Sequence, residues 1–245
     1  MLTALLSATL LITPAPIHAD GEAIIRAVHA RYGSVWHRTQ TFVQKTTYPN
    51  GRVDTWYEAI ELPGKLRIDI APISGGRTML FRNDSIYQFG AGTLRGKQPY
   101  VHSMMVLLGD MFVDDPDRTI ARLKAQGFDL SKHHESTWDG RPALVVGATA
   151  GDTTSNQFWL DRERMVVVRM IERMPDNRRF EAHFSGYQPH GASWVESRIA
   201  FFIDGKADQL EEYHDVRTRV THEPGLFDPD TYRRATWAGE GATRW

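Results

Sequence analysis

The sequence contains no cysteine among its 245 residues, and this absence excludes several kinds of chemistry. Without thiols the chain can form no disulfide bond, no thiolate nucleophile and no cysteine-ligated metal centre. Its formal net charge of −1 is also far from the basic balance that suits binding to nucleic acids or anionic membranes. We therefore expect no nucleic-acid partner, and a stability that depends on a buried core.

Long apolar runs are also absent, and the most apolar segment lies at the N-terminus. Residues 1–19, MLTALLSATLLITPAPIHA, hold an apolar run from Ala4 to Ile12, then two prolines, and then Ala19. The run is shorter than the ~20 residues that span a bilayer, but it fits a secretory signal peptide with a small residue at the cleavage site. We expect residues 1–19 to be a signal peptide and residues 20–245 to be one exported domain. An uncleaved anchor or a misplaced start codon is the alternative.

Three segments carry helical spacing of apolar residues. The first runs from Gly21 to Gly33, the second covers residues 100–112 (YVHSMMVLLGDMF), and the third covers residues 115–127 (DPDRTIARLKAQG). Asp115 followed by Pro116 is typical of a helix start. Between the sheet and the second helix, residues 90–98 (GAGTLRGKQ) resemble a phosphate loop only superficially, because Gln98 stands where Ser or Thr is required. We interpret them as a mobile loop.

The rest of the chain alternates polar and apolar residues between turn signals. In YEAIELPGKLRIDIAP, residues 57–72, Pro63-Gly64 separates two such runs, and Pro49-Asn50-Gly51 marks another turn. Closely spaced turns without intervening helices favour antiparallel pairing. We predict an α+β fold: a single curved antiparallel β-sheet that forms an unclosed barrel, with helices covering its concave face. An incompletely filled concavity would hold an apolar ligand.

Candidate ligand-binding residues follow from this alternation and from the apolar face of the second helix. Methionine adapts to irregular partners, which suits a lid that meets a flexible chain. Ordinary core packing would use the same residue types, and the sequence does not show which strand face is concave. The candidates are Trp56, Ile60, Leu66, Ile68, Ile70, Met104, Met105, Leu108, Phe180, Phe184, Ile199 and Phe201.

Three polar clusters could suggest a metal or catalytic site. The segment His133–Glu135 lies on a predicted strand, where neighbouring side chains point to opposite faces and cannot easily chelate one ion. The segment Tyr213–Asp215 could supply a base and the residue that orients it, but the sequence contains no G-x-S-x-G motif to supply a nucleophile. We therefore interpret this segment as the polar face of an exposed strand. The acidic residues at 114, 115 and 117 are explained by helix capping. We therefore predict no catalytic residues, no metal site and no cofactor.

Several short motifs, taken in order, resemble the periplasmic lipoprotein carrier LolA and the wider outer-membrane lipoprotein-sorting family. They are Phe42-Val43-Gln44-Lys45, the strand ending at Pro63, Asn83-Asp84-Ser85-Ile86-Tyr87-Gln88-Phe89, Asp139-Gly140-Arg141, Phe158-Trp159-Leu160-Asp161 and Leu226-Phe227-Asp228-Pro229. The similarity covers most of residues 20–245. One position differs. In the carrier, the residue before the proline that corresponds to Pro63 is an Arg, and this Arg ties the strand to the lid. Here that residue is Leu62. The nearby Arg67 does not match that Arg in register.

The resemblance implies an unclosed barrel with a helical lid over a cavity that receives acyl chains. It also implies a periplasmic, monomeric carrier of lipid or lipoprotein acyl chains, with a possible inner- or outer-membrane transport partner. A lipid-sensing or lipoprotein-sensing interaction module of the same fold is the alternative. A hydrolase that uses His214 or the 133–135 group is a third.

Overall fold

The computed structural model describes residues 20–231, so the expected signal peptide at residues 1–19 lies outside the described residues. The helical elements are α1 (Gly21–Tyr32), the short 3-10 turn η1 (Ile73–Gly75), α2 (Ser103–Met105), the π-helical turn η2 (Val106–Asp110), α3 (Met111–Val113) and α4 (Pro116–Ala125). The first six strands are β1 (Thr39–Thr47), β2 (Val53–Glu61), β3 (Lys65–Ile70), β4 (Arg77–Arg82), β5 (Ser85–Gly90) and β6 (Thr93–Pro99). The later strands are β7 (His133–Trp138), β8 (Arg141–Val146), β9 (Gln157–Asp161), β10 (Val167–Arg173), β11 (Arg179–Ser185), β12 (Gln188–His190), β13 (Ser193–Val195), β14 (Arg198–Ile203) and β15 (Lys206–Thr218).

One antiparallel sheet of 13 strands organises the molecule, in the order β6-β5-β4-β3-β2-β1-β15-β14-β11-β10-β9-β8-β7. The long strand β15 pairs with β1, and this pairing joins the N-terminal half of the sheet, β1–β6, to the C-terminal half. The edge strands β6 and β7 do not meet, so the sheet is curved but not closed. The predicted α+β fold with an unclosed sheet is confirmed.

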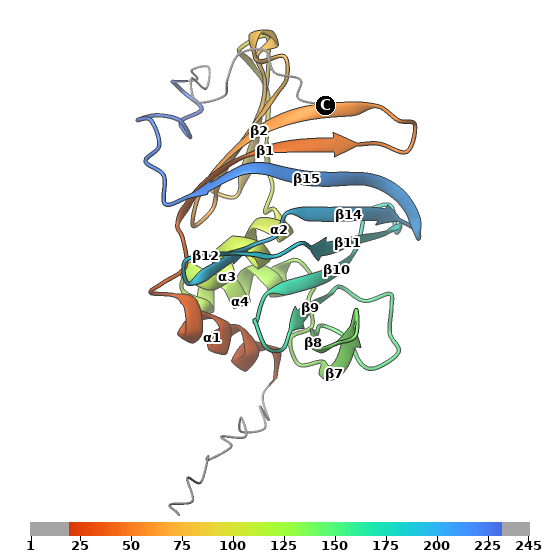
Figure 1. Ribbon diagram of the computed structural model, residues 1–245. Helices are drawn as coiled ribbons and strands as arrows, with labels where there is room; N and C mark the ends of the chain where they lie inside the picture. The colour runs from red at the N-terminus through yellow and green to blue at the C-terminus, as the bar shows by residue number, and fades with distance from the viewer. Residues whose placement is uncertain (1–19, 232–245) are drawn as a thin grey trace, which may run out of the picture.

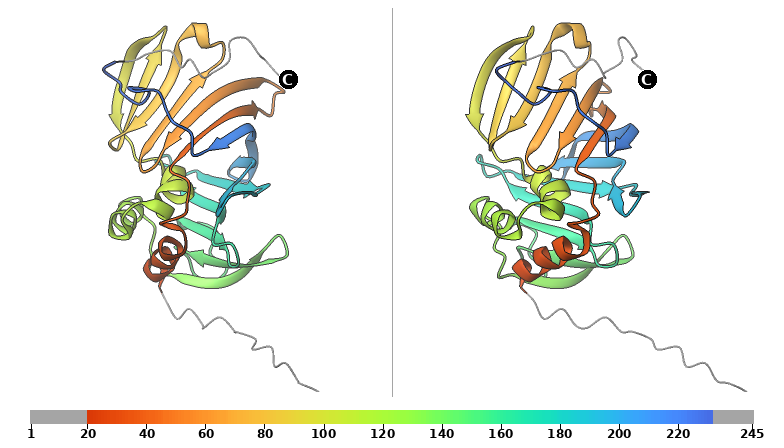
Figure 2. Two further views of the ribbon diagram at one scale, coloured as in Figure 1. Left: turned by 60° about the vertical axis from the view of Figure 1, so that its left-hand side comes forward. Right: turned by 90° about the vertical axis from the view of Figure 1, so that its left-hand side faces the viewer.

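The helices lie on the concave side of the sheet, as Figures 1 and 2 show. α1 is capped by the side chain of Asp20, which accepts a hydrogen bond from the backbone N–H of Ala23 at 3.1 Å. The cap of α4 is Asp115, which accepts from the N–H of Asp117 at 2.8 Å. Both helix starts were expected from the sequence. Within residues 20–231, no helix is both long and apolar enough to cross a bilayer.

The helices fill the two halves of the sheet unequally. α1, α3 and α4 pack with β8–β11 and β14 in one large core that contains fully buried side chains such as Phe112, Phe158 and Leu160. Over the N-terminal half, a smaller cluster of Leu66, Ile68, Phe81 and Ile86 receives Met105. Figure 2 shows β1–β6 arching away from the helices. The space left under this half holds the candidate site.

The prediction of a mobile loop at residues 90–98 is wrong. Positive φ angles at Ala91 and Gly92 make a tight turn, after which β6 runs back along β5 and pairs Tyr87 with Lys97. β6 is an edge strand that is exposed along almost its whole length. A strand without a buried face needs no apolar alternation, so residues 93–99 carry no strand signal.

Candidate functional site

A pocket lies between the concave face of the N-terminal half and the helix above it. We call the continuous segment Ser103–Val113, formed by α2, η2 and α3, the lid helix, and the space beneath it the lid pocket. Strands β1–β3 and β15 form the wall, and residues 194–196, at the end of β13 and directly after it, close one end. The pocket volume is about 120 Å³. An apolar cavity of ~150 Å³ can hold benzene, so this space accepts part of a hydrocarbon chain but not a whole lipid.

The apolar part of the lining comes from both the sheet and the lid helix. Alternation along each strand puts every second side chain on the concave face, and Trp56 and Ile60 of β2 point inward together. The lid helix supplies Met104, Met105 and Leu108 from above. The full apolar lining is Phe42, Trp56, Ile60, Leu62, Leu66, Ile68, Met104, Met105, Leu108, Trp194 and Val195.

The structure brings most, but not all, of the sequence-predicted site residues to this pocket. Those at the lining are Trp56, Ile60, Leu66, Ile68, Met104, Met105 and Leu108. Ile70 packs beside them, against the cluster of Leu66 and Ile68. Phe180, Phe184, Ile199 and Phe201 belong to the large core of the C-terminal half. Contact of any of these residues with a ligand stays a prediction.

The lid helix is tied to the β2–β3 turn at Leu62, the position at which the LolA resemblance implies an Arg. Leu62 packs against Gly109, and a Cβ at Gly109 would lie only 2.4 Å from the Leu62 Cδ2 atom. Next to this contact, the backbone N–H of Gly64 donates to Asp110 Oδ1 at 2.9 Å. Arg122 of α4 donates to Asp110 Oδ2 at 3.1 Å. Apolar packing and a buried carboxylate thus hold the strand and the lid helix together.

Arg67, which follows Pro63 by four positions, faces away from the pocket. It is buried on the convex side, where its Nε donates to Asp69 Oδ2 at 2.7 Å and its Nη1 donates to the carbonyl of Leu226 at 3.0 Å. Leu226 and Phe227 cover this side of the sheet with Tyr57, Leu80 and others. Arg67 therefore fixes the C-terminal segment and does not contact the lid helix.

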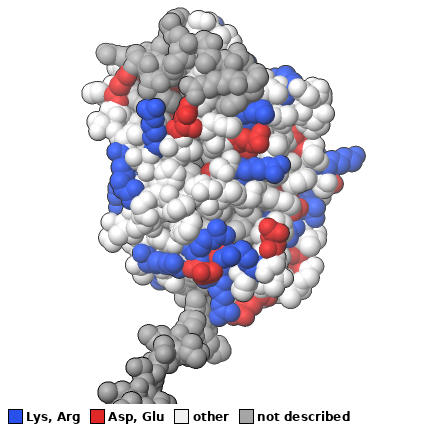
Figure 3. Space-filling model, viewed as in Figure 1, with Lys and Arg blue, Asp and Glu red and all other residues white. Residues whose placement is uncertain are grey.

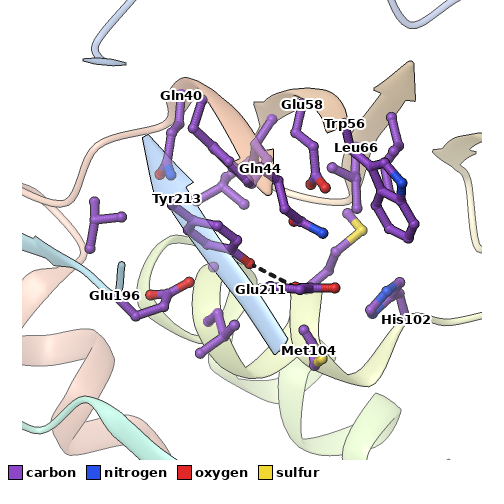
Figure 4. Close-up of a pocket in the computed structure, with 18 of the residues that line it drawn as sticks. Gln40, Gln44, Trp56, Glu58, Leu66, His102, Met104, Glu196, Glu211 and Tyr213 are labelled. Atoms are coloured by element: carbon purple, nitrogen blue, oxygen red, sulfur yellow. Dashed lines mark hydrogen bonds between the residues drawn. The ribbon is translucent and has the colours of Figure 1, made fainter. Parts of the chain in front are cut away.

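The opposite part of the lid pocket is polar, which the sequence reasoning missed. Its polar lining is His37, Gln40, Gln44, Glu58, His102, Glu196, Glu211 and Tyr213. Figure 4 shows the side chains of Gln44, Glu58 and Glu211 directed into the same space. The prediction that Tyr213–Asp215 form the polar face of an exposed strand is wrong for Tyr213, which lines the pocket. His214 and Asp215 are exposed. The signal available was alternation: Glu58 lies between Trp56 and Ile60 on one strand face.

The polar groups of the pocket differ in how well they are paired. Glu211 accepts hydrogen bonds from Gln209 Nε2 at 2.8 Å and from the Tyr213 hydroxyl at 3.4 Å. His37 bridges Ser193 Oγ at 2.8 Å and Gln40 Oε1 at 2.7 Å. Within residues 20–231, the buried nitrogens Trp56 Nε1 and His102 Nδ1 have no hydrogen-bond partner.

Burial shifts the protonation of these groups toward their neutral forms. Loss of solvent raises the pKa of Glu211 to about 8 and that of Glu196 to about 7. The pKa of Glu58 is raised well above its usual range by burial and by the nearby Glu211. Burial also lowers the pKa values of His37 and His102 to about 4. The pocket is therefore largely uncharged at neutral pH.

The clusters considered for metal or catalytic chemistry are not assembled into such sites among the described residues. Glu135 pairs with Arg162 at 3.0 Å, and His134 Nδ1 lies 3.0 Å from the carbonyl of Ala148. Asp114 pairs with Arg118 at 3.1 Å, beside the cap residue Asp115. No group of three or more potential ligands among residues 20–231 could hold a metal ion.

Charged side chains are mixed on the surface. On the face seen in Figure 3, Lys and Arg alternate with Asp and Glu, and neither sign forms a continuous field. A polyanion such as nucleic acid would need a basic stripe or patch. On this face, the charge distribution therefore offers no basic footprint of that kind.

No family model matches the sequence, and no curated protein matches it significantly. Solved structures do share the fold. A domain from Vibrio parahaemolyticus described as outer-membrane lipoprotein-sorting is 12% identical, with a TM-score of 0.57 over 86% of this chain and 97% of that one. A DUF1329 family protein from Desulfovibrio piger is also 12% identical, with a TM-score of 0.56 over 87% of this chain and 98% of that one.

A LolA superfamily protein from Nitrosomonas europaea shows the same likeness. It is 12% identical, with a TM-score of 0.52 over 86% of this chain and 99% of that one. At this identity the comparison establishes the fold. The chain therefore has the fold of solved lipoprotein-sorting and LolA superfamily structures, which confirms the resemblance expected from the sequence.

Proposed function

We propose that the protein is a periplasmic carrier that binds the acyl chains of a lipid or a lipoprotein in the lid pocket. The observation that carries this proposal is the incompletely filled apolar space between the concave wall and the lid helix. The fold shared with lipoprotein-sorting structures supports it. Binding of this kind needs no catalytic group, metal or cofactor, and we propose no enzymatic activity.

The energetics of the apolar wall suit such a ligand. Each methylene moved from water to the pocket contributes about 0.8 kcal/mol, so about ten buried carbons give useful affinity after the entropy cost of binding. The closed pocket of about 120 Å³ is smaller than this chain requires. Uptake would therefore move the lid helix outward, and the unbranched side chains of Met104 and Met105 can repack around the chain.

The direct test is native mass spectrometry of protein purified from cells without detergent. We expect a bound mass that matches a lipid or an acylated peptide and that is lost on delipidation. The delipidated protein should then take up an uncharged hydrophobic fluorophore, and Ile68→Glu or Met105→Glu should abolish that uptake.

The matched control is Leu94→Glu on the exposed edge strand β6, where Leu94 is 47% exposed. This variant adds the same charge away from the pocket and should bind as the wild type does. A delipidated wild-type protein that takes up neither fluorophore nor lipid would contradict the carrier function.

A further inference from the structure

The lid pocket has an acidic end that acyl-chain binding alone does not explain. Glu58 comes from the middle of β2, Glu211 from β15 and Glu196 from the segment after β13. Glu58 and Glu211 are each 5% exposed, and Glu196 is half-buried. Three separate elements thus place carboxyl groups at one space, beside the apolar wall (Figure 4).

Glu58 is the least satisfied of these groups. No hydrogen bond or ion pair to its carboxyl is found within residues 20–231, although it is almost fully buried and directed into the pocket. Buried carboxyl groups normally have a partner, because an unpaired one loses its hydration without compensation. The unpaired group on the pocket side indicates that a ligand supplies the missing donor.

The lining contains no basic side chain that could neutralise these acids. Among the described residues that line the lid pocket there is no Lys or Arg. The two lining histidines, His37 and His102, have pKa values lowered to about 4 by burial, so they are neutral near pH 7. A positive charge at this end must therefore come from outside the lining.

We propose that the lid pocket selects amphiphiles whose polar end is a cationic amine, a ligand class that deepens the proposed carrier function and rests on it. The ammonium group lies between the carboxylates of Glu58 and Glu211, and the hydrocarbon chain lies along Trp56, Ile68 and Met105. An ammonium offers several N–H donors and one positive charge, which can give Glu58 the partner that it lacks and add an ionic partner to the hydrogen bonds of Glu211. An anionic head group would be repelled by the same carboxyl groups once they are ionised.

This arrangement couples binding to proton release. In the empty pocket burial favours the protonated form of all three carboxyl groups: the pKa of Glu58 is raised well above its usual range, that of Glu211 is about 8 and that of Glu196 is about 7. An ammonium stabilises the ionised carboxylates, so binding expels protons. Tyr213, the remaining titratable group of the lining, has a pKa raised well above its usual range and stays neutral. Affinity for a cationic amphiphile should therefore rise with pH until the carboxyl groups ionise unaided.

The test compares three amphiphiles of the same chain length on delipidated full-length protein: dodecylammonium and dodecanoate below their micelle concentrations, and dodecanol below its solubility limit. Competition with an uncharged hydrophobic fluorophore gives the dissociation constants. At pH about 8 we expect dodecylammonium to bind at least about tenfold more tightly than dodecanol, with dodecanoate weakest. The advantage of dodecylammonium should shrink at pH about 6, because releasing protons from the carboxyl groups costs more free energy at lower pH.

The double variant Glu58→Gln/Glu211→Gln should bring dodecylammonium to within about threefold of dodecanol, with both amphiphiles measured on the same variant. Retained dodecanol binding also shows that the variant pocket is folded. The matched control is Glu212→Gln, the neighbour of Glu211 on β15, whose side chain pairs with Lys45 outside the pocket. It should keep the full preference.

The outcomes separate the two proposals. If dodecanol binds but dodecylammonium binds no more tightly, the amine selectivity is overturned and the carrier function stands. If the double variant keeps the preference, the assignment to Glu58 and Glu211 is overturned. If none of the three amphiphiles binds the wild type, the carrier function fails and the amine selectivity fails with it.

Discussion

The backbone N–H of Gly64 donates a hydrogen bond of 2.9 Å to the carboxylate of Asp110 and so ties the β2–β3 turn to the lid helix. Asp110 is 2% exposed and also accepts from Arg122, which extends to Asp84 on the β4–β5 turn at 2.9 Å. A single buried carboxylate therefore joins the wall of the pocket, the lid helix and α4. Together with the contact between Leu62 and Gly109, it sets how tightly the pocket is closed.

Asp110→Ala should loosen this closure. The backbone N–H of Gly64 and the guanidinium of Arg122 would each lose an acceptor, and we expect a loss of about 1 to 3 kcal/mol in the free energy of unfolding. Amide hydrogen exchange at Gly64 should accelerate. The control Asp84→Ala removes the more exposed partner of Arg122 and should cost less than about 1 kcal/mol. Equal losses of stability in the two variants would contradict the conclusion that Asp110 holds the β2–β3 turn to the lid helix.

Gly109→Ala should force the lid helix and Leu62 apart, because the new Cβ would lie 2.4 Å from Leu62 Cδ2. Overpacking of this kind costs about 1 to 3 kcal/mol. Leu62→Ala in the same chain should recover part of the loss, so a double-mutant cycle from urea unfolding should show favourable coupling. Gly75→Ala, where nothing lies within 4 Å of the added Cβ, serves as the control. Additive losses at positions 62 and 109 would show that the two residues do not press on each other.

Glu211 contributes to the pH dependence of stability. Its pKa is about 8 in the folded protein against 4.5 ordinarily, so the folded state binds the proton more tightly than the unfolded state does. The stability that this proton contributes is fully present below about pH 4.5 and is lost as the pH rises through about 8. Each unit of the pKa difference corresponds to about 1.4 kcal/mol at most. We therefore expect Glu211→Gln to reduce the loss in the free energy of unfolding between these two pH values by a few kcal/mol. Denaturant unfolding at several pH values measures this effect, and an unchanged slope would show that Glu211 ionises as freely as an exposed carboxyl.

Arg67→Ala should release the C-terminal segment from the convex side of the sheet. The change leaves Asp69 buried without its ionic partner, which costs about 3 to 5 kcal/mol, and removes the hydrogen bond to the carbonyl of Leu226. Limited proteolysis should then cut after residue 219 sooner than in the wild type. Arg82→Ala, which removes a more exposed hydrogen bond of 3.1 Å to the carbonyl of Phe227, should have a much smaller effect. Cleavage at the same rate in both variants would argue against a special role for the buried pair.

The sequence by itself determined the class of fold and most of the element order. Turn residues such as Asn50-Gly51, alternation in segments such as 66–70, and the cap at Asp115 act over a few residues, so their physics is visible locally. The same locality explains the failure at β6, where an exposed edge strand has no buried face to leave a pattern. Alternation also identified Trp56, Ile60, Leu66 and Ile68 as one face of the sheet.

Tertiary structure decided which face meets the lid helix, and it decided the chemistry of the pocket. Glu58 and Glu211 are more than 150 positions apart and come together because β15 pairs with β1, which pairs with β2. Their raised pKa values result from the solvent that this assembly excludes, and no local pattern reports that exclusion. Likewise, Phe184 and Ile199 alternate as the pocket residues do, but the helices fill the space above them. Alternation names a face, whereas packing from distant segments decides whether that face is core or cavity.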